Sequence, residues 1–195
     1  SFLVLFLIGS TCLFAQQISN IDFTAIKKRL DATPTLYKSL MTRFAQSDTT
    51  LSYEDYQALY YGQCFQDNYS PYGNDYDAFD KFKKAYQDGD YKTAAGHAMK
   101  MVNKNPMDMP MTFKAIVCYH YMKDDATKKS ILTRYNNIMK VIFDSGDGKT
   151  DSTAFVVMSV SDEYELMSNM DVQITSQSLV GHCDLMKLKE NDLGL

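Results

Sequence analysis

The sequence predicts a mainly α-helical (α+β) domain with a small β element at its C-terminal end. Apolar residues recur at helical spacing from about residue 21 to residue 143. After Gly148 the pattern changes to a β-branched and aromatic run, STAFVVMSV, which is typical of a strand. The length of 195 residues and the hydrophobic content of 45% fit one domain with a sizeable core.

The first fifteen residues, SFLVLFLIGSTCLFA, form an uncharged apolar run that ends in a small residue. This composition is typical of the apolar region and cleavage site of a secretory signal peptide. The run is shorter than the roughly 20 apolar residues that a membrane-spanning helix needs. We therefore expect residues 1–15 to be removed and residues 16–195 to form a single domain without a membrane span, in the periplasm, secreted or at the cell surface. Attachment of a lipid to Cys12 is the alternative.

Three cysteines follow the expected cleavage site, namely Cys64, Cys118 and Cys183. An odd number of cysteines cannot all pair within one chain. Buried free thiols, or one disulfide beside a free thiol, are the two interpretations.

Three helices are expected in the first part of the domain. Residues 21–31 and the segment from Leu36 to Phe44 have helical apolar spacing, and Pro34 separates them. Ser52 is predicted to cap the third helix, with Asp55 in the first turn completing the capping arrangement.

The Tyr-rich segment YQALYYGQCFQDNYSPYG contains two kinds of tyrosine. Tyr56 and Tyr60 fall on the apolar stripe of the third predicted helix, so we expect both in the core. Tyr61 lies off this stripe, and Tyr69 and Tyr72 lie in a predicted loop. These three tyrosines are therefore candidates for contact with a partner, because tyrosine combines a large contact area with a polar group.

The segment DAFDKFKKAYQDGDYKTAAGHAMKMVNKNP predicts two helices joined by a tight turn. It resembles a tetratricopeptide repeat through Tyr86, Gly89, Asp90, Tyr91, Ala94 and Pro106. A second predicted helix pair follows, and its Asp124 lies about 34 residues, one repeat length, after Asp90. The resemblance implies antiparallel helix pairs with a binding groove, which adds Tyr91 to the candidate contacts.

The expected β element covers about residues 149–195. STAFVVMSV and CDLMKLKEN are its predicted strands, and SDEYELMSNM is a predicted helix capped by Ser161. Two short strands form a marginally stable unit unless they pack on helices. We therefore expect a further partner strand beyond the C-terminal end.

The order of these segments resembles an uncharacterised family of exported proteins of gut-type Gram-negative bacteria, DUF4919. The most specific segments are SDTTLSYEDYQALYYG and SGDG followed by TAFVVMSVSDEY. The resemblance covers nearly the whole chain after the signal peptide. It implies a location in the cell envelope and a helical-repeat fold, and it supplies no activity and no catalytic residues.

The motifs that carry known chemistry do not fit the sequence. GDGKT lacks the first glycine of a phosphate-binding loop, because Phe143 occupies that position. Asp144, Asp147 and Asp151 lack the spacing of an EF-hand, which leaves a solvated turn or an irregular oxygen site. The histidines and cysteines lack zinc-site spacing, and no GxSxG motif occurs. We therefore expect no enzyme activity, metal or cofactor.

Two tripeptides, DTT and DST, resemble the acceptor motif of a general O-glycosylation system of such bacteria. They make Thr49 and Ser152, both in predicted loops, candidate modification sites. Aspartate, serine and threonine also cluster in ordinary loops and caps, which is the alternative reading.

The charge balance is mildly acidic, with a net charge of -4, so the sequence does not favour nucleic acid as a partner. We expect an exported protein-binding or scaffold module with an envelope protein as partner. A glycan-binding protein that uses the loop tyrosines is the alternative.

Overall fold

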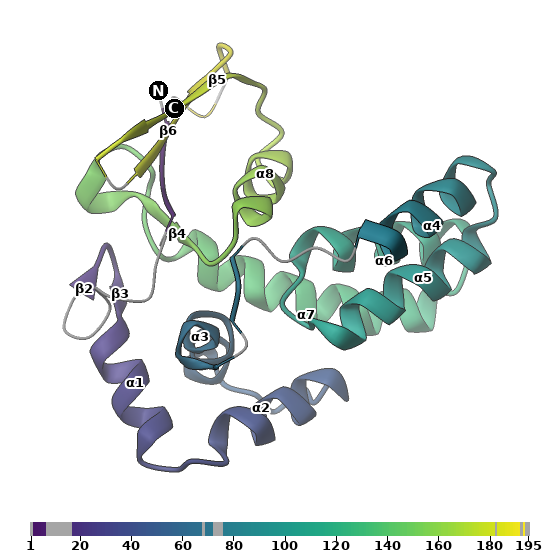
Figure 1. The fold of residues 1–195 in the computed structure, drawn as a ribbon, viewed down its shortest axis with the longest axis horizontal. Coiled ribbons are helices and arrows are strands. Elements are labelled where there is room, and N and C mark those ends of the chain that lie inside the picture. Colours follow the sequence, from purple (N-terminus) through teal and green to yellow (C-terminus); the bar gives the residue numbers. More distant parts are fainter. Residues whose placement is uncertain are drawn as a thin grey trace.

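The structure is a computed structural model that describes residues 2–6, 17–67, 69–71, 76–181, 183–191 and 193. The described part is mainly helical with a small sheet at one end, as the sequence predicts (Figure 1). Eight α-helices and two 3-10 helices are present in these residues: α1 (Phe23–Asp31), α2 (Leu36–Ala45), α3 (Tyr53–Gly62), η1 (Gln63–Phe65), α4 (Tyr76–Gln87), α5 (Tyr91–Lys104), α6 (Met109–Tyr121), α7 (Asp125–Phe143), η2 (Asp151–Thr153) and α8 (Val160–Asn169).

Most of the helix starts are set by local sequence. In four helices an aspartate side chain accepts a hydrogen bond from the backbone N–H three residues later; these are Asp22, Asp90, Asp108 and Asp124. Such caps satisfy an N–H group that has no partner inside the helix. The predicted capping box of α3 is confirmed, since Ser52 and Asp55 each accept the other's backbone N–H.

The prediction that Ser161 caps α8 is wrong. Ser159 is the N-cap, and its Oγ accepts a hydrogen bond from the backbone N–H of Asp162 at 3.2 Å. Both serines can cap a helix. Because Val160 already has a helical conformation, Ser161 lies inside the first turn.

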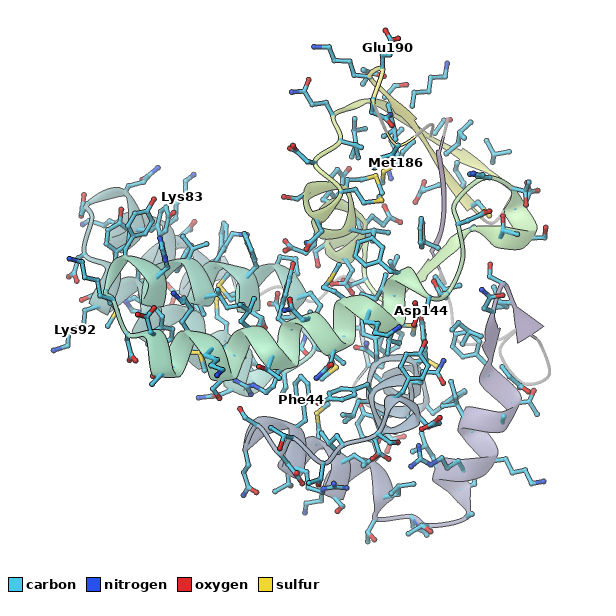
Figure 2. All side chains as sticks on the ribbon, turned by 180° about the vertical axis from the view of Figure 1, so that it is seen from behind. Phe44, Lys83, Lys92, Asp144, Met186 and Glu190 are labelled. Atoms are coloured by element: carbon cyan, nitrogen blue, oxygen red, sulfur yellow. The ribbon has the colours of Figure 1, made fainter. Side chains whose placement is uncertain are left out.

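Helices α4, α5, α6 and α7 pack against one another in chain order and form an arm on one side of the molecule (Figure 1). The turn from α4 to α5 contains Gly89 at φ +74°, a conformation that favours glycine. Helix α7 is the longest helix of the described residues. It runs from the end of the arm, near Lys92, to Asp144 in the middle of the molecule (Figure 2).

The larger sheet has the strand order β4-β1-β6-β5. Its strands are β1 (Phe2–Phe6), β4 (Phe155–Val157), β5 (Ile174–Val180) and β6 (Cys183–Leu188). β1 is parallel to β4 and antiparallel to β6, and β5 is antiparallel to β6. Two further strands, β2 (Gln17–Ile18) and β3 (Ile21–Asp22), form a separate antiparallel pair.

The sheet differs from the expected β element in two strands, β5 and β1. Strand β5 was not predicted, because its sequence ITSQSLV has no apolar face and six of its seven residues are exposed. β6 has partners on both sides, so the described strands already form one sheet. Residues 2–6 of the expected signal peptide supply one of these partners, so cleavage at the expected position would leave β6 paired with β5. Cys12 and the expected cleavage position between residues 15 and 16 lie outside the described residues.

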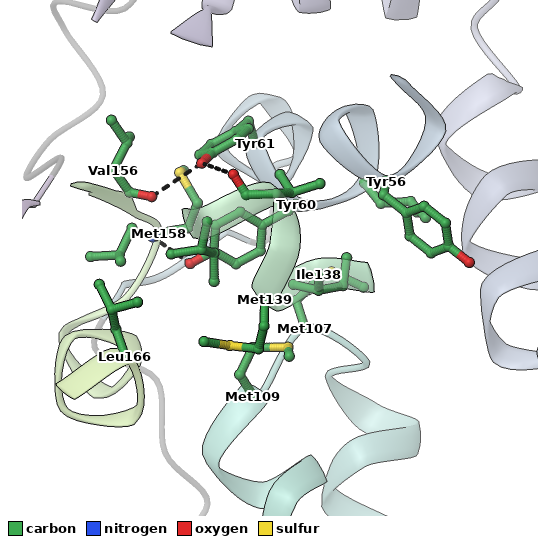
Figure 3. Packing of buried hydrophobic residues seen from close by; sticks show 14 of the residues in the cluster. Tyr56, Tyr60, Tyr61, Met107, Met109, Ile138, Met139, Val156, Met158 and Leu166 are labelled. Carbon is green, nitrogen blue, oxygen red and sulfur yellow. Dashed lines mark hydrogen bonds between the residues drawn. The ribbon is translucent and has the colours of Figure 1, made fainter. Parts of the chain in front are cut away.

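The core consists of two clusters. The larger joins α1, α2, α3 and α7 to β4, α8 and β6, and the smaller lies between α4, α5 and α6. Tyr56 and Tyr60 are buried in the larger cluster, as the helical stripe predicts (Figure 3). The Tyr60 hydroxyl donates to Asp162 at 2.7 Å and accepts from the backbone N–H of Met158 at 3.1 Å. α3 is thereby tied to the segment that precedes α8.

The interpretation of the cysteines as free thiols is confirmed for Cys64, Cys118 and Cys183. Cys118 and Cys183 are buried, and Cys64 is partly buried. Burial raises the pKa of Cys64 to about 12 and that of Cys118 to about 11. Both thiols are therefore protonated at neutral pH, and a protonated thiol is a poor nucleophile.

Candidate functional site

The structure overturns one of the four candidate contact residues. Tyr61 is completely buried, and its hydroxyl lies 3.3 Å from the carbonyl oxygen of Val141 and 3.2 Å from that of Val156 (Figure 3). Its ring packs edge to face on Phe23 and Tyr60. Tyr61 is a core residue, and the prediction that it contacts a partner is wrong. The cause is that α3 is buried on several sides, so the position of a residue off its apolar stripe does not indicate exposure.

Of the two loop tyrosines, Tyr69 is among the described residues. Tyr69 is partly buried, and its hydroxyl donates a hydrogen bond of 2.6 Å to the carbonyl oxygen of Met158. This bond ties the loop to the chain before α8. Tyr72 lies outside the described residues. The described tyrosines of this segment, Tyr56, Tyr60, Tyr61 and Tyr69, are thus buried or partly buried and form no exposed platform.

Tyr91 has the environment that a contact residue needs. It is the first residue of α5, and its ring stacks on Tyr121, the last residue of α6, with 4.4 Å between the ring centroids and 13° between the planes. Tyr121 is 54% exposed. Tyr86 also packs on Tyr91, edge to face, with 5.5 Å between the ring centroids. We call Tyr86, Tyr91, His120 and Tyr121 the aromatic tip.

The fold explains why these rings meet. Helices α4 and α6 end, and α5 and α7 begin, at the same end of the arm, so residues at these termini come together (Figure 1). His120 packs on Tyr121 with 5.6 Å between the ring centroids. The following residue, Met122, is 37% exposed. The exposed aromatic surface at the end of the arm is thus formed by residues at the termini of successive helices.

Sequence reasoning found Tyr91 and missed Tyr121. A signal was available, because Tyr121 directly precedes the turn MKDD, about one repeat after the turn that precedes Tyr91. A search for aromatic residues at both ends of successive predicted helices would have found the pair. Their contact itself depends on the packing of α5 on α6.

A second cluster of chemically distinctive residues lies on α8. Asp162, Glu163 and Glu165 are all at least 93% buried. Burial raises the pKa of Asp162 to about 7 and that of Glu163 to about 9, and it also raises the pKa of Glu165. After burial, the charge of Asp184 is the next largest cause that raises the pKa of Glu163. Removal of charged groups from water favours their protonated forms.

Neighbouring side chains hold these carboxyl groups. The Tyr135 hydroxyl donates to Glu165, and Gln177 donates to Glu163 at 3.2 Å. Raised pKa values are also found at acid–base sites, where a pocket gives substrate access to the groups. The burial and internal hydrogen bonds of this cluster favour a structural role.

The GDGKT loop forms a turn. The backbone N–H groups of Asp147 and Gly148 both donate to the carbonyl oxygen of Thr153 at 2.8 Å. The Asp147 carboxylate accepts the backbone N–H of Lys149 at 3.0 Å. These bonds are internal to the loop, as the interpretation as a solvated turn requires. Within the described ranges, no three histidine, cysteine, aspartate or glutamate side chains are grouped as metal ligands.

The two candidate O-glycosylation residues, Thr49 and Ser152, are exposed, in the α2–α3 loop and in η2 respectively. We expect the intact mass of protein purified from its native cells to exceed the mass of the polypeptide by that of one or two glycans. Thr49→Ala and Ser152→Ala should each remove one increment, whereas Thr133→Ala, at another exposed hydroxyl, should remove none. An unmodified native mass would contradict this prediction.

These features define a class: a mainly α-helical protein with an arm of successive helices, an aromatic tip and a small mixed sheet. The chain belongs to the family DUF4919, a domain of unknown function, whose family model matches residues 24–195. No curated protein and no solved structure matched the chain. Among the helices that the structure describes, none combines the length and hydrophobicity of a membrane span.

Proposed function

We propose that the protein is an exported protein-binding module of the cell envelope and that its partner binds at the aromatic tip. The observation that carries the proposal is the stacked pair of Tyr91 and the 54% exposed Tyr121. The uncharged apolar run of residues 1–15 supports the export part of the proposal.

The chemistry of the tip favours a protein surface as its ligand. Exposed tyrosines supply a large contact area with two rotatable side-chain bonds, so little conformational freedom is lost when they bind. Tyrosine is also enriched among the residues that dominate binding energy at protein interfaces. Tyr91 stacks on one face of the Tyr121 ring, and the 54% of Tyr121 that is exposed supplies area for an apolar or aromatic side chain of a partner.

Photo-cross-linking in the native cells tests this proposal. We expect the variant Tyr121→p-benzoylphenylalanine to form one recurrent protein adduct on illumination. Tyr164→p-benzoylphenylalanine is the matched control, because Tyr164 is 50% exposed but lies on α8, away from the tip. Equal adducts from both positions, or none from position 121, would refute a partner at the tip.

A simple substitution gives a second readout. Tyr121→Ala should remove the partner from affinity-purified protein and lower the free energy of unfolding by about 0.5–1.5 kcal/mol, since the exposed ring still stacks on Tyr91. The glycan-binding alternative relied on the tyrosines of the Tyr-rich segment. The burial of Tyr61 and the Tyr69–Met158 bond leave it few contacts among the described residues.

A further inference from the structure

A cavity of about 270 Å³ lies between α7 and the loop that joins α2 to α3, and no residue of the aromatic tip is in its lining. Its lining is rich in hydroxyl and cationic groups and consists of Ser47, Asp48, Thr49, Tyr56, Ala126, Lys129, Ser130, Thr133 and Arg134. A second cavity of about 280 Å³ shares Thr49, Tyr56 and Thr133 with the first and extends to Lys140. The two cavities are therefore neighbours along α7, and we call them together the groove.

Arg134 is the most informative residue of the groove. It is 92% buried, and its Nε has no hydrogen-bond partner among the described residues. Nη1 lies 3.4 Å from the carbonyl oxygen of Phe44 and 3.3 Å from that of Ala45, at the C-terminal end of α2. Both distances are long for a charged donor. Within the part of the chain that the structure describes, no carboxylate forms an ion pair with this guanidinium.

A buried cation without a counter-ion is costly, because charge is removed from water without compensation. Burial accordingly lowers the pKa of Arg134. The lining contains one carboxylate, Asp48, which accepts hydrogen bonds from Arg43 at 2.7 Å and from Thr50. The charge of Asp48 is therefore matched by Arg43, outside the lining, while Arg134 and Lys129 are left in excess.

The hydroxyl groups of the first cavity also present donors. Asn137 donates to the Tyr56 hydroxyl at 3.0 Å, and Ser130 donates to the Ser47 hydroxyl at 2.7 Å. A hydroxyl that accepts a hydrogen bond still has its own O–H to donate. Among the described residues, neither the Tyr56 O–H nor the Ser47 O–H donates to a protein acceptor. Figure 3 shows the Tyr56 hydroxyl pointing away from the packed cluster.

The donors thus come from three elements: α7 carries Arg134 and Lys129, α3 carries Tyr56, and the α2–α3 loop carries Ser47. Donors that surround a space on several sides suit a tetrahedral oxyanion, whereas one guanidinium alone can satisfy a planar carboxylate. The volume is also larger than one ion needs, since a water molecule occupies about 30 Å³. We propose that the groove binds the phosphate or sulfate group of a small organic ester, with the organic part along Tyr56 and Thr133.

Binding to the recombinant chain tests the proposal by calorimetry. Glucose 6-phosphate and glucose 6-sulfate are the ester probes, and glucose and inorganic phosphate are the reference ligands. We expect at least one ester to bind at least tenfold more tightly than glucose and than inorganic phosphate. Binding of glucose with the affinity of the esters, equal or tighter binding of inorganic phosphate, or no binding of either ester would overturn it.

Two adjacent lysines on α7 provide a matched pair of variants. Lys129 lines the cavity, whereas Lys128 is paired with Asp125 at 2.5 Å and does not line it. Lys129→Gln should weaken binding of the ester about tenfold, and Lys128→Gln should leave it unchanged. Tyr56→Phe, which removes only the hydroxyl, should weaken binding about threefold or more. If the two lysine variants changed the affinity for the ester equally, the proposal that the ester binds in this groove would be overturned.

Arg134→Gln should abolish binding, but Arg134 also contacts the last carbonyl groups of α2. Circular dichroism of this variant shows whether it folds. If it does not fold, Lys129→Gln and Tyr56→Phe decide the question, because both residues can lose their polar group without a change in backbone contacts.

Discussion

Lowering the pH from about 9 to about 5 is expected to stabilise the folded protein, and Glu163→Gln should remove much of this dependence. Glu163 has a pKa of about 9 in the fold, and Asp162 has a pKa of about 7. In the unfolded chain both carboxyl groups titrate near 4. Above that pH the unfolded state loses protons that the folded state keeps, so the free energy of unfolding falls as the pH rises.

The limits of this window follow from the same values. The contributions of both groups to the free energy of unfolding are complete below pH 4. As the pH rises, the contribution of Asp162 declines until about pH 7 and that of Glu163 until about pH 9. Each group contributes at most about 1.4 kcal/mol per pH unit. Asp48 acts in the opposite direction, because hydrogen bonds from Thr50 and Arg43 lower its pKa to about 2. Its contribution is lost only as the pH falls from about 4 to about 2.

Urea unfolding at pH 5 and pH 8 measures the effect. Glu163→Gln should raise the free energy of unfolding at pH 8 by on the order of 2–4 kcal/mol and change it little at pH 5. Glu190→Gln is the control, since Glu190 is exposed and its substitution should have a small effect at both pH values. A wild-type protein that is as stable at pH 8 as at pH 5 would show that Glu163 and Asp162 are not buried in this way.

Gly146→Ala is expected to destabilise the protein by about 3 kcal/mol or more. A Cβ atom at this position would lie 2.3 Å from the carbonyl oxygen of Thr153 and 2.4 Å from that of Ala154. Both atoms belong to the backbone, so no side-chain rotation relieves the overlap. The loop would have to open, and the bonds from Asp147 and Gly148 to Thr153 would be lost at the point where β4 begins.

Gly96→Ala is the matched control. Gly96 lies inside α5 on an exposed face, and a Cβ atom there would meet nothing within 4 Å. Alanine favours the helix over glycine, so this variant should gain about 0.5–1 kcal/mol. Thermal unfolding of both variants separates the two cases. Similar melting temperatures for Gly146→Ala and the wild type would mean that the loop does not approach Gly146 as closely as described.

Local sequence was sufficient to predict most helices. Their starts depend on caps such as Ser52 and Asp90, which act on backbone groups two or three residues away. The same local reasoning placed Tyr56 and Tyr60 in the core. It failed for β5, since the partner of that strand is β6 and an exposed strand shows little hydrophobic alternation.

The candidate sites were less predictable. Tyr91 was recognised from its resemblance to a repeat position, but its partner Tyr121 lies on another helix. Tyr61 was misassigned, because the elements that cover it, α1, α7 and β4, are distant in the sequence. The groove at Arg134 gave no signal in the sequence, since an arginine on a helix is usually exposed.

By itself the sequence determined the family, the helical architecture, the caps and the turn at Gly89, because each depends on residues that are close in the chain. Only the tertiary structure decided which tyrosines are exposed, which carboxyl groups are protonated and which buried cation has no counter-ion among the described residues. Exposure, desolvation and charge compensation are set by residues that packing brings together from distant segments. The aromatic tip, the α8 carboxyl groups and the Arg134 groove are properties of this packing.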